Sequence, residues 1–570
     1  TRTRSSFEFA AKSLGAMTTL VQSTGSSIEK GESVIDTGYT LRAVGADCIV
    51  MRHPSAGAPH LMATHLDIPI INAGDGMHEH PSQALLDAVT ILKHKKSFKG
   101  LQATIIGDIF HSRVARSACH LLTRFGVKIT LCGPPEFVPD IATTLVPGLR
   151  VTRHMEDALR GTDVVMLLRD GRVAEVAAPN KTRGAADEKF DARGLIVAPG
   201  FVDLHVHLRE PGQSYKETIA TGTAAAAAGG FTSVCTMPNT QPVVDTAEWV
   251  SWLRQPERGA VVNVFPIAAA TRGSKGGTLT DFSALQRAGA VAVTDDGKPI
   301  LDDDIMRMAL RLGAELKLPV VQHAEDTRLT ENCSMHAGPT SFRLGLRAMP
   351  GLAEATVVDR DVTLAQQIRE SRLHVAHLST SDALKAVRRG KRAKARVTCE
   401  VTPHHFTLLD ENVGEYDTNF KMNPPLRSAS DREAILVALA DGTVDAIATD
   451  HAPHALHEKQ VEFERASFGI TGLETALGLA VTHLHRAHKI PLTRIVELFT
   501  SGPARVFDLN GRGSLARGSF ADVTIFDPKK RWTFEAANTH SLSRNTPFDG
   551  CQLTGKVVTT IVAGRIVYRT

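Results

Sequence analysis

The sequence predicts an α/β protein whose two halves are built differently. From residue 1 to about 169, short apolar strands alternate with amphipathic helices, a pattern typical of βαβ units and a doubly wound parallel sheet. From about 198 to 500, strand–helix units follow one another eight times, which fits a (β/α)₈ barrel. After about residue 505 the pattern changes to short strands and turns.

The composition is that of a folded protein of several domains. Of the 570 residues, 42% are hydrophobic and 22% are charged, and a typical domain of roughly 150 residues predicts two to four domains. A net charge of +4 does not favour a nucleic-acid binder. The sequence shows no long apolar run and no signal peptide, so we expect no membrane partner and a cytoplasmic location. The seven cysteines form no C-x-x-C pair, which argues against a disulfide framework or a Cys-ligated zinc site.

In the first half, the strand-like runs and helical segments can be placed individually. The predicted strands are 18–22, 47–51, 69–72, 103–108, 128–133 and 163–168, and two clear helices are 82–95 and 112–126. We expect this half, residues 1–169, to be one domain.

In the second half, eight strands are predicted at 202–207, 232–237, 262–267, 291–295, 320–324, 373–378, 397–401 and 446–450. Six of the eight carry or run into His, Asp or Asn at their carboxyl ends, where barrel enzymes place their catalytic groups. We assign the barrel to 201–504. Strand-and-turn pieces on both sides of it, 170–200 and 505–570, predict a small flanking β-domain.

Histidines at these strand ends indicate a metal site. His205 and His207 lie two apart on one strand and therefore point to the same face, which in a barrel is the interior. Alone, this pair also fits an ordinary, partly exposed strand. Together with the other strand-end groups, His323, His377 and Asp450, it forms a donor set that suits a divalent metal such as zinc. Asp295 and Asp296 offer one further carboxylate, and the other is expected to cap the turn.

Such a site predicts hydrolysis or formation of an amide bond. A bound metal activates water against a polarised carbonyl, and Asp450 can serve as general base and then as general acid. Arg209, two residues after His207, can hold a carboxylate through its planar guanidinium. Asn239 and Asn423, expected at strand ends, either bind substrate or cap turns.

In the first half, cationic and polar residues lie where helices and strands begin or end. A helix N-terminus with Arg and Thr donors suits a phosphate. Taken singly, each is equally well read as a solvated charge or a cap. The set is Arg2, Thr3, Lys30, Arg52, His80, Gln83, Arg113 and Arg169.

The second half resembles class I dihydroorotase, an amidohydrolase-superfamily enzyme that interconverts N-carbamoyl-L-aspartate and dihydroorotate. The motifs are DLHVHLREPG (203–212), TMPNT (236–240), TDDG (294–297), VQHAE (321–325), AHLST (376–380), KMNPPLR (421–427) and ATDHAPH (448–454). The resemblance implies one or two zinc ions held by His205, His207, Asp296, His323, His377 and Asp450, with Asp450 as the catalytic base. It also implies substrate contacts at Arg209, Asn239, Asn423, His454, Phe468 and Gly469.

The choice of Asp296 over Asp295 rests on this resemblance. Hydantoinases and allantoinases usually bridge two metals with a carboxylated lysine, so the TDDG and LREPG motifs favour dihydroorotase. A hydantoinase-like cyclic amidase is the weaker alternative.

The first half resembles the catalytic chain of aspartate carbamoyltransferase. The motifs are TRTRSSFE (1–8), STGSSIEKGES (23–33), MRHPSAG (51–57), GDGMHEHPSQALLD (74–87), IIGDIFHSRVARS (105–117) and VVMLLR (164–169). The resemblance implies carbamoyl phosphate binding by Arg2, Thr3, Arg52, His80 and Gln83. It implies L-aspartate binding by Lys30, Arg113 and Arg169, with Lys30 reaching a neighbouring subunit. That family works as a trimer, so we expect a homo-oligomer or a complex with a transcarbamoylase.

This half departs from the family pattern. The Ser that normally precedes TRTR is absent, and after VVMLLR the aspartate-binding segments are replaced at once by DGRVAEVA, near 169/170. We therefore expect a zinc-dependent dihydroorotase of pyrimidine (UMP) biosynthesis with an attached, inactive transferase-like domain. The alternatives are a bifunctional enzyme, since the two families catalyse consecutive steps, and a non-catalytic partner of a full-length transcarbamoylase.

Overall fold

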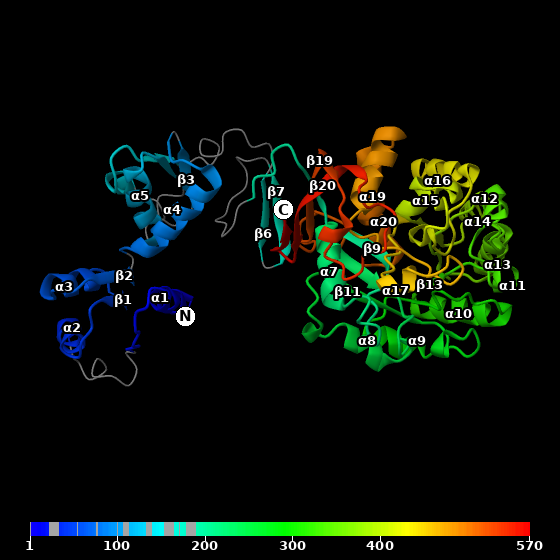
Figure 1. Cartoon of the computed structure of the whole chain (residues 1–570), viewed down its shortest axis with the longest axis horizontal. Coiled ribbons are helices and arrows are strands. Elements are labelled where there is room, and N and C mark those ends of the chain that lie inside the picture. Colours follow the sequence, from blue (N-terminus) through cyan, green and yellow to red (C-terminus); the bar gives the residue numbers. More distant parts are fainter. Residues whose placement is uncertain are drawn as a thin grey trace. The chain divides into compact units, whose positions relative to one another are not determined.

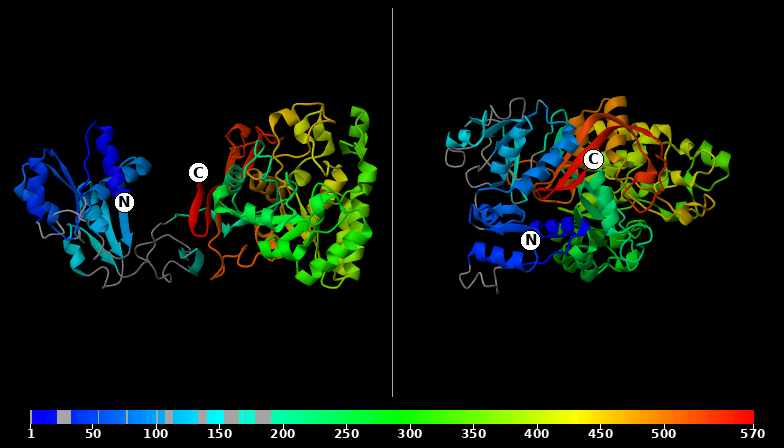
Figure 2. Two further views of the ribbon diagram at one scale, coloured as in Figure 1. Left: turned by 90° about the horizontal axis from the view of Figure 1, so that it is seen from below. Right: turned by 60° about the vertical axis from the view of Figure 1, so that its left-hand side comes forward.

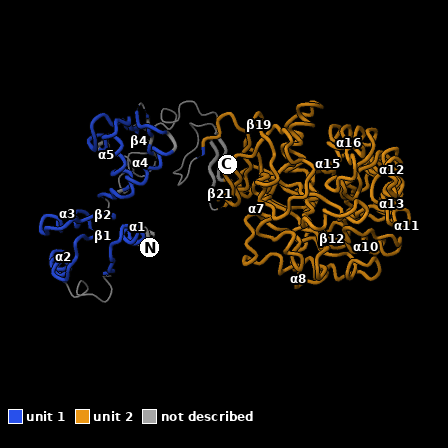
Figure 3. Tube along the Cα trace, in the orientation of Figure 1, with its two compact units in different colours: residues 1–167, 177–190 blue, residues 168–176, 191–570 orange. Residues whose placement is uncertain are grey.

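The computed structural model describes residues 2–21, 33–53, 55–75, 78–99, 101–106, 113–132, 140–152, 165–169, 171–177 and 190–570. The chain forms two compact units, one of residues 1–167 with 177–190 and the other of residues 168–176 with 191–570 (Figure 3). Within the described residues, no helix is long and apolar enough to cross a membrane.

The first unit alternates helices and strands. Its elements are α1 (Arg2–Ser13), α2 (Val34–Ala43), β1 (Ile49–His53), α3 (Ala58–His65), β2 (Ile70–Asp75), α4 (Pro81–Lys95), β3 (Gln102–Ile106), α5 (Arg113–Arg124), β4 (Lys128–Cys132), η2 (Asp140–Thr144), β5 (Arg150–Thr152) and β6 (Val165–Arg169). In the described part, β1–β2 and β3–β4–β5 form two short parallel sheets, and β6 pairs with β7 (Arg172–Ala177) in a separate two-stranded sheet. The apolar face of α5 packs on β4 through Cys119, Leu122 and Leu131, all buried.

One predicted strand of this unit is wrong. Residues 18–21 of the predicted strand 18–22 are not in a strand, and Leu20 and Val21 are exposed. A run of β-branched and apolar residues forms a strand only where a neighbouring strand can pair with it. Among the described residues, no strand lies beside 18–21. β5 was not predicted, because three residues are too short to show a pattern.

The second unit is built on eight parallel strands in chain order (Figure 1). They are β9 (Phe201–Val206), β10 (Phe231–Thr236), β11 (Asn263–Ala269), β12 (Ala292–Thr294), β13 (Val320–Gln322), β16 (Leu373–Val375), β17 (Val397–Val401) and β18 (Ala446–Ile447). After β18, His451 forms a parallel bridge with Val206 and accepts a hydrogen bond from His207 N (2.9 Å). The barrel is thus nearly closed, and each of the eight predicted strands contributes to it.

Helices connect these strands and cover the barrel. They are α7 (Ile219–Ala228), α8 (Ala247–Leu253), α9 (Phe282–Ala288), α10 (Asp303–Leu316), α11 (Thr327–Thr330), α12 (Pro339–Leu344), α13 (Leu352–Gln367), α14 (Ser381–Arg392), α15 (Pro403–Thr407), α16 (Ala429–Asp441), α17 (Leu456–Lys459), α18 (Ala476–Leu479), η7 (Ala480–Ala487), α19 (Leu492–Phe499) and α20 (Ser501–Val506). Short polar residues cap several of them: Thr218 caps α7, and Asp302 caps α10 through the amides of Asp304 and Ile305. β14 (Met335–His336) and β15 (Ala348–Met349) pair outside the barrel.

Segments from both sides of the barrel form one antiparallel sheet. Its order is β21 (Arg565–Arg569), β20 (Gln552–Val562), β19 (Val523–Thr533) and β8 (Ile196–Pro199). β7 (Arg172–Ala177) begins beside residues 518–520, where Val173 N donates to Ser519 O at 3.0 Å. Figure 2 shows the C-terminal strands, in red, at one side of the barrel.

An aromatic cluster joins this sheet to the barrel. Phe201 of β9 is fully buried, and its ring centroid lies 5.2 Å from that of Phe499, 5.9 Å from that of Phe231 and 6.1 Å from that of Phe526 in β19. Barrel and sheet therefore share one hydrophobic core.

We expect Phe201→Ala to lower the free energy of unfolding by about 3–5 kcal/mol, because it leaves a cavity in this cluster. Denaturant unfolding of the purified chain measures the change. Phe342→Ala is the matched control, since Phe342 is 91% exposed and its removal should change stability by less than about 0.5 kcal/mol. Equal effects of the two substitutions would contradict this assignment of the shared core.

Candidate metal and substrate site

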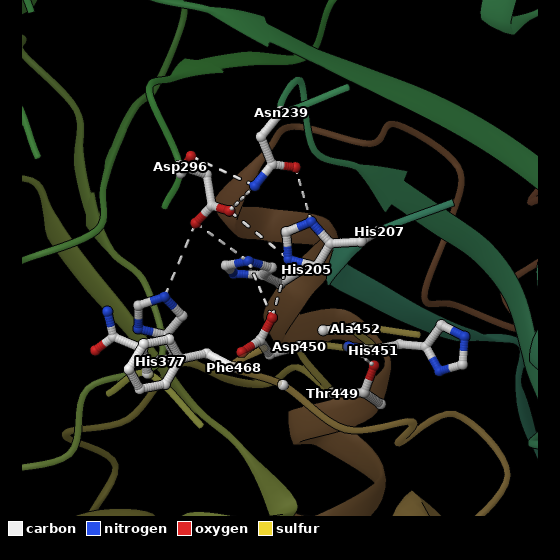
Figure 4. Close-up of polar contacts among 12 residues, drawn as sticks. His205, His207, Asn239, Asp296, His377, Thr449, Asp450, His451, Ala452 and Phe468 are labelled. Atoms are coloured by element: carbon white, nitrogen blue, oxygen red, sulfur yellow. Dashed lines mark hydrogen bonds and ion pairs between the residues drawn. The ribbon is translucent and has the colours of Figure 1, made fainter. Parts of the chain in front are cut away.

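Strand β9 places two histidines inside the barrel. His205 and His207 are both buried, and their Nε2 atoms face the same carboxylates (Figure 4). His205 Nε2 lies 3.3 Å from Asp296 Oδ1 and 3.5 Å from Asp450 Oδ1. His207 Nε2 lies 3.1 Å from Asp450 Oδ1 and 3.7 Å from Asp296 Oδ2. The two-residue spacing on a strand thus turns both rings toward one point.

Two further histidines approach Asp296 from the other side. His323 follows β13 and His377 follows β16, and their facing nitrogens, Nδ1 and Nε2, are 2.9 Å apart. The same two nitrogens lie 3.8 and 3.9 Å from Asp296 Oδ1. Asp296 is therefore shared by two groups of potential metal ligands, His205 with His207 and His323 with His377.

The donor atoms suit a divalent metal. Ligands of a tetrahedral zinc ion at about 2.0–2.1 Å are themselves about 3.3 Å apart, close to the separations between His205, His207 and the two carboxylates. His205 Nε2, which faces the two carboxylates, is buried and has no hydrogen-bond partner. Buried polar atoms usually have partners, so this atom indicates a missing ligand.

Glu400 of β17 orients the ring of His205 through Nδ1, the nitrogen that does not face Asp296. Its carboxylate is buried and accepts hydrogen bonds from His205 Nδ1 (3.1 Å) and His374 Nε2 (3.2 Å). Burial alone would raise the pKa of Glu400, but these two hydrogen bonds outweigh it and lower the pKa to about 2. With its proton on Nδ1, His205 presents an unprotonated Nε2 to the centre. Nothing in the sequence pattern singled out Glu400.

Asp203 is a second buried carboxylate that sequence reasoning missed. It accepts hydrogen bonds from the amides of His205 (3.0 Å) and Thr449 (3.1 Å), and so ties the first strand of the barrel to the end of the last. Burial raises its pKa to about 7.

Three non-glycine residues among the described members of the predicted site have left-handed backbone conformations. The φ angles are +60° at Arg209, +28° at His377 and +47° at Asp450. Non-glycine residues with positive φ cost free energy and occur where the surrounding structure holds them, frequently at functional sites. Sharp turns at these strand ends direct the side chains across the barrel mouth.

Arg209 is a buried cation without an ion-pair partner within residues 190–570. Its Nε donates to Pro453 O at 3.1 Å, and Nη2 lies 3.2 Å from His454 Nε2. Burial lowers the pKa of Arg209 to about 10, and burial together with Arg209 and nearby lysines lowers the pKa of His454 to about 2. His454 is therefore neutral beside a cation that still lacks a counter-charge.

The loop of Phe468 and Gly469 closes this side of the site. Phe468 O lies 2.8 Å from His454 Nε2. Gly469 N donates to Lys421 O at 3.0 Å, so its amide is already used within the protein.

The two predicted asparagines differ in position. Asn239 follows β10 as expected, and it bonds His207 Nδ1 (2.9 Å) and Asp296 Oδ2 (3.1 Å) (Figure 4). Asn423 does not end a strand: it lies in the loop between η6 (Thr418–Phe420) and α16, and its Nδ2 donates to Glu325 Oε2 at 2.8 Å. The preceding barrel strand ends at Val401, as predicted, and a long connection carries Asn423 back to the barrel mouth.

Asp295 turns away from the histidine cluster. It accepts hydrogen bonds from Thr271 N (2.8 Å) and Thr271 Oγ1, in the loop after β11. The adjacent Asp296 faces the histidines. Asp295 therefore joins two neighbouring loops instead of capping its own turn.

The transferase-like site residues are only partly described. Lys30 lies outside the described residues, and of Arg2, Thr3, Arg113 and Arg169 only the backbone is described, in α1, α5 and β6. Arg52 is exposed on β1. His80 is buried at the start of α4, where its amide donates to Ser117 Oγ (2.9 Å), and Gln83 Nε2 donates to Asp87 (3.0 Å).

Two family models match the chain. One, described as "Dihydro-orotase-like", matches residues 194–383. The other, described as "Aspartate/ornithine carbamoyltransferase, carbamoyl-P binding domain", matches residues 1–93.

Curated relatives match the second half over almost their whole length. A dihydroorotase of Solibacter usitatus (strain Ellin6076) is 50% identical over 416 residues, which cover 73% of this chain and 95% of that protein. A dihydroorotase of Anaeromyxobacter dehalogenans (strain 2CP-1 / ATCC BAA-258) is 49% identical over 417 residues, covering 72% and 95%.

Solved structures of cyclic amidases share the fold. An L-hydantoinase (dihydropyrimidinase) from Arthrobacter aurescens has a TM-score of 0.64 at 24% identity, covering 72% of this chain and 93% of that chain. A dihydropyrimidinase from Brevibacillus agri NCHU1002 has a TM-score of 0.61 at 22% identity, covering 71% and 91%. At these identities the likeness shows the barrel architecture alone.

We expect Glu400→Gln to weaken Zn²⁺ binding by about 10- to 100-fold, because His205 loses the charged partner that fixes its tautomer. Competition with a chromogenic chelator measures the affinity. Glu370→Gln is the control, since Glu370 is exposed and pairs with Arg396 away from these histidines. An unchanged affinity in Glu400→Gln would show that Glu400 does not support the metal ligands.

Proposed function

Because the chain belongs to the dihydroorotase family, we propose that its barrel catalyses the reversible cyclisation of N-carbamoyl-L-aspartate to dihydroorotate. The observation that carries this proposal is the buried cluster of His205, His207, Asp296, His323, His377 and Asp450 at the carboxyl ends of the barrel strands. The unpaired buried guanidinium of Arg209 beside it supplies the recognition of an acidic substrate.

We assign the metal as zinc, held in one or two positions. His205, His207 and Asp450 would hold one ion and His323 and His377 the other, with Asp296 between them, as the shared carboxylate of the two ligand groups supports. A metal bound there supplies Lewis acidity toward a carbonyl and lowers the pKa of water.

Arg209 binds a carboxylate of the substrate in this scheme. Its guanidinium is removed from water and faces His454 and the carbonyl of Pro453, so an entering carboxylate would provide the missing counter-charge. Asn239, Asn423, His454 and the chain at Phe468 and Gly469 would surround the remaining polar atoms of the substrate. The Gly469 amide is the weakest of these assignments, because Lys421 O already occupies it.

Asp450 transfers the proton in the proposed ring opening and ring closure. In ring opening the carboxylate takes a proton from the attacking water and gives it to the ring nitrogen as the C–N bond breaks. In ring closure it takes the proton from that nitrogen and gives it to the departing oxygen, which leaves as water. Asp450 Oδ1 lies 3.1 Å from His207 Nε2, so the carboxylate and the imidazole face the same point. The left-handed backbone at Asp450 restricts the carboxylate further.

We propose that the transferase-like unit has no carbamoyltransferase activity of its own. Directly after β6 the chain enters β7, whose Val173 donates to Ser519 O in the second unit. The segment that would continue a transferase fold instead pairs with β6 in a two-stranded sheet and contacts residues 518–520, which precede β19. Binding of carbamoyl phosphate or L-aspartate, and assembly with further copies or with a transcarbamoylase, remain compatible with this proposal.

We expect the purified, zinc-loaded chain to hydrolyse dihydroorotate, and a chelator to abolish turnover. His205→Ala should lose metal and activity, and Asp450→Asn should lower kcat by at least about 10²- to 10⁴-fold, because the proton carrier is lost. The fall in dihydroorotate absorbance measures the rate.

Asp382→Asn is the control, since Asp382 is exposed and pairs only with Lys385 in the described structure. Retained activity in Asp450→Asn would refute its role. Turnover of hydantoin or dihydrouracil in place of dihydroorotate would favour a hydantoinase-like amidase.

We expect the chain to form no carbamoyl aspartate from carbamoyl phosphate and L-aspartate, since the aspartate-binding part of the fold is replaced after residue 169. Radiolabelled L-aspartate at millimolar carbamoyl phosphate provides a sensitive assay. Product formation that increases with chain concentration would instead support a bifunctional enzyme assembled from several copies.

A further inference from the structure

A segment from outside the barrel lies against the candidate substrate site. Residues 541–546, in the connection between β19 and β20, contact the loop after β9 and the loops after β18. Ser541 Oγ and Leu542 N both donate to Glu217, and Ser543 Oγ donates to Lys216 O at 2.6 Å. These contacts join positions more than 300 residues apart in sequence.

Asn545 makes the contacts nearest to the site. Its side chain is buried, with 5% of the residue exposed. Nδ2 donates to Ala452 O and to Gly469 O, both at 3.0 Å, and Oδ1 accepts from His454 N at 2.9 Å. Both amide hydrogens and the carbonyl oxygen are therefore used, and only a carboxamide supplies two donors and an acceptor in this arrangement.

The partners of Asn545 belong to two separate segments of the site. Ala452 and His454 follow the predicted base Asp450, whereas Gly469 adjoins Phe468 on the facing loop. The segments touch directly as well, since Ala452 N donates to Ile470 O at 2.8 Å. Gly469 has φ +119°, and a Cβ there would come within 2.5 Å of the Ala452 Cβ, so the backbones are as close as they can pack.

Lys459 makes further hydrogen bonds to the segment that contains Gly469. Its buried Nζ donates to Ser467 O at 2.8 Å and to Gly469 O at 3.2 Å. The carbonyl of Gly469 thus accepts from both Asn545 and Lys459. One oxygen held by two donors fixes the orientation of the peptide between Gly469 and Ile470.

We propose that Asn545 is a positioning residue for substrate binding, which it serves by setting the separation between segments 452–454 and 467–470. This inference rests on the proposed function, because these segments carry His454 and Phe468 and lie beside Arg209. Asn545 itself touches neither the substrate nor the metal ligands. The segment after the barrel is then part of the substrate site and not only a support for the fold.

The test compares Asn545→Ala with the unchanged chain. We expect the KM for dihydroorotate to rise about 10-fold or more, with kcat within about threefold and bound zinc unchanged. Hydrogen–deuterium exchange should become faster at 452–455 and 467–471 and stay unchanged in β10 and β11. Asn538→Ala is the matched control, because Asn538 is an exposed asparagine of the same connection, bonded to Glu535; we expect no change in either readout.

Asn545→Asp provides a second variant of the same shape. It keeps the acceptor for the His454 amide and loses the donors to Ala452 O and Gly469 O, so exchange should increase at 467–471 and, to a smaller extent, at 452–455. It also serves if Asn545→Ala does not fold.

Two outcomes would overturn the proposal. One is an unchanged KM in a folded variant, and the other is a uniform increase in exchange with loss of zinc, which indicates a purely structural role. The exchange measurement needs no substrate. Absence of dihydroorotate turnover in the unchanged chain would therefore refute the proposed function, while the exchange pattern would still decide the role of Asn545.

Discussion

At the carboxyl ends of the barrel strands, where the predicted metal ligands lie, the structure depends on the compensation of buried charge. Asp296 and Asp450 are removed from water among four buried imidazoles, and the charge balance of these groups is favourable only while their geometry is held. The shared carboxylate of Asp296 is central, because each ligand group includes it. A divalent ion held by these residues would complete this balance.

The supporting residues make that geometry rigid. Glu400 and Asn239 bond the outward-facing nitrogens of His205 and His207, so both rings have one orientation and one tautomer. Asp203 ties β9 to the end of β18, where the positive φ of Asp450 directs its carboxylate inward. Strain at a few backbone positions is thereby balanced by hydrogen bonds from several strands.

The small sheet beside the barrel is coupled to the site by the connection between its own strands. Phe201 and Phe526 join barrel and sheet in one core, and the connection from β19 to β20 places Asn545 between the loops around Arg209 and His454. The strand β7, which follows the transferase-like unit, is hydrogen-bonded at the margin of the same sheet.

The sequence by itself determined the alternation of strands and helices, the barrel and the strand-end residues, because local periodicity and two-residue spacing fix which side chains share a face. All six proposed metal ligands were identifiable in this way or by family resemblance, and their roles stay predictions. Only the tertiary structure decided which residues support them. His205 and Glu400 are 195 positions apart, and Asn545 and His454 are 91 apart, so no local pattern records the contact. The same reason explains the misplaced Asn423 and the strand expected at 18–22: a long connection or a missing neighbouring strand is a property of the whole fold, not of the residues around it.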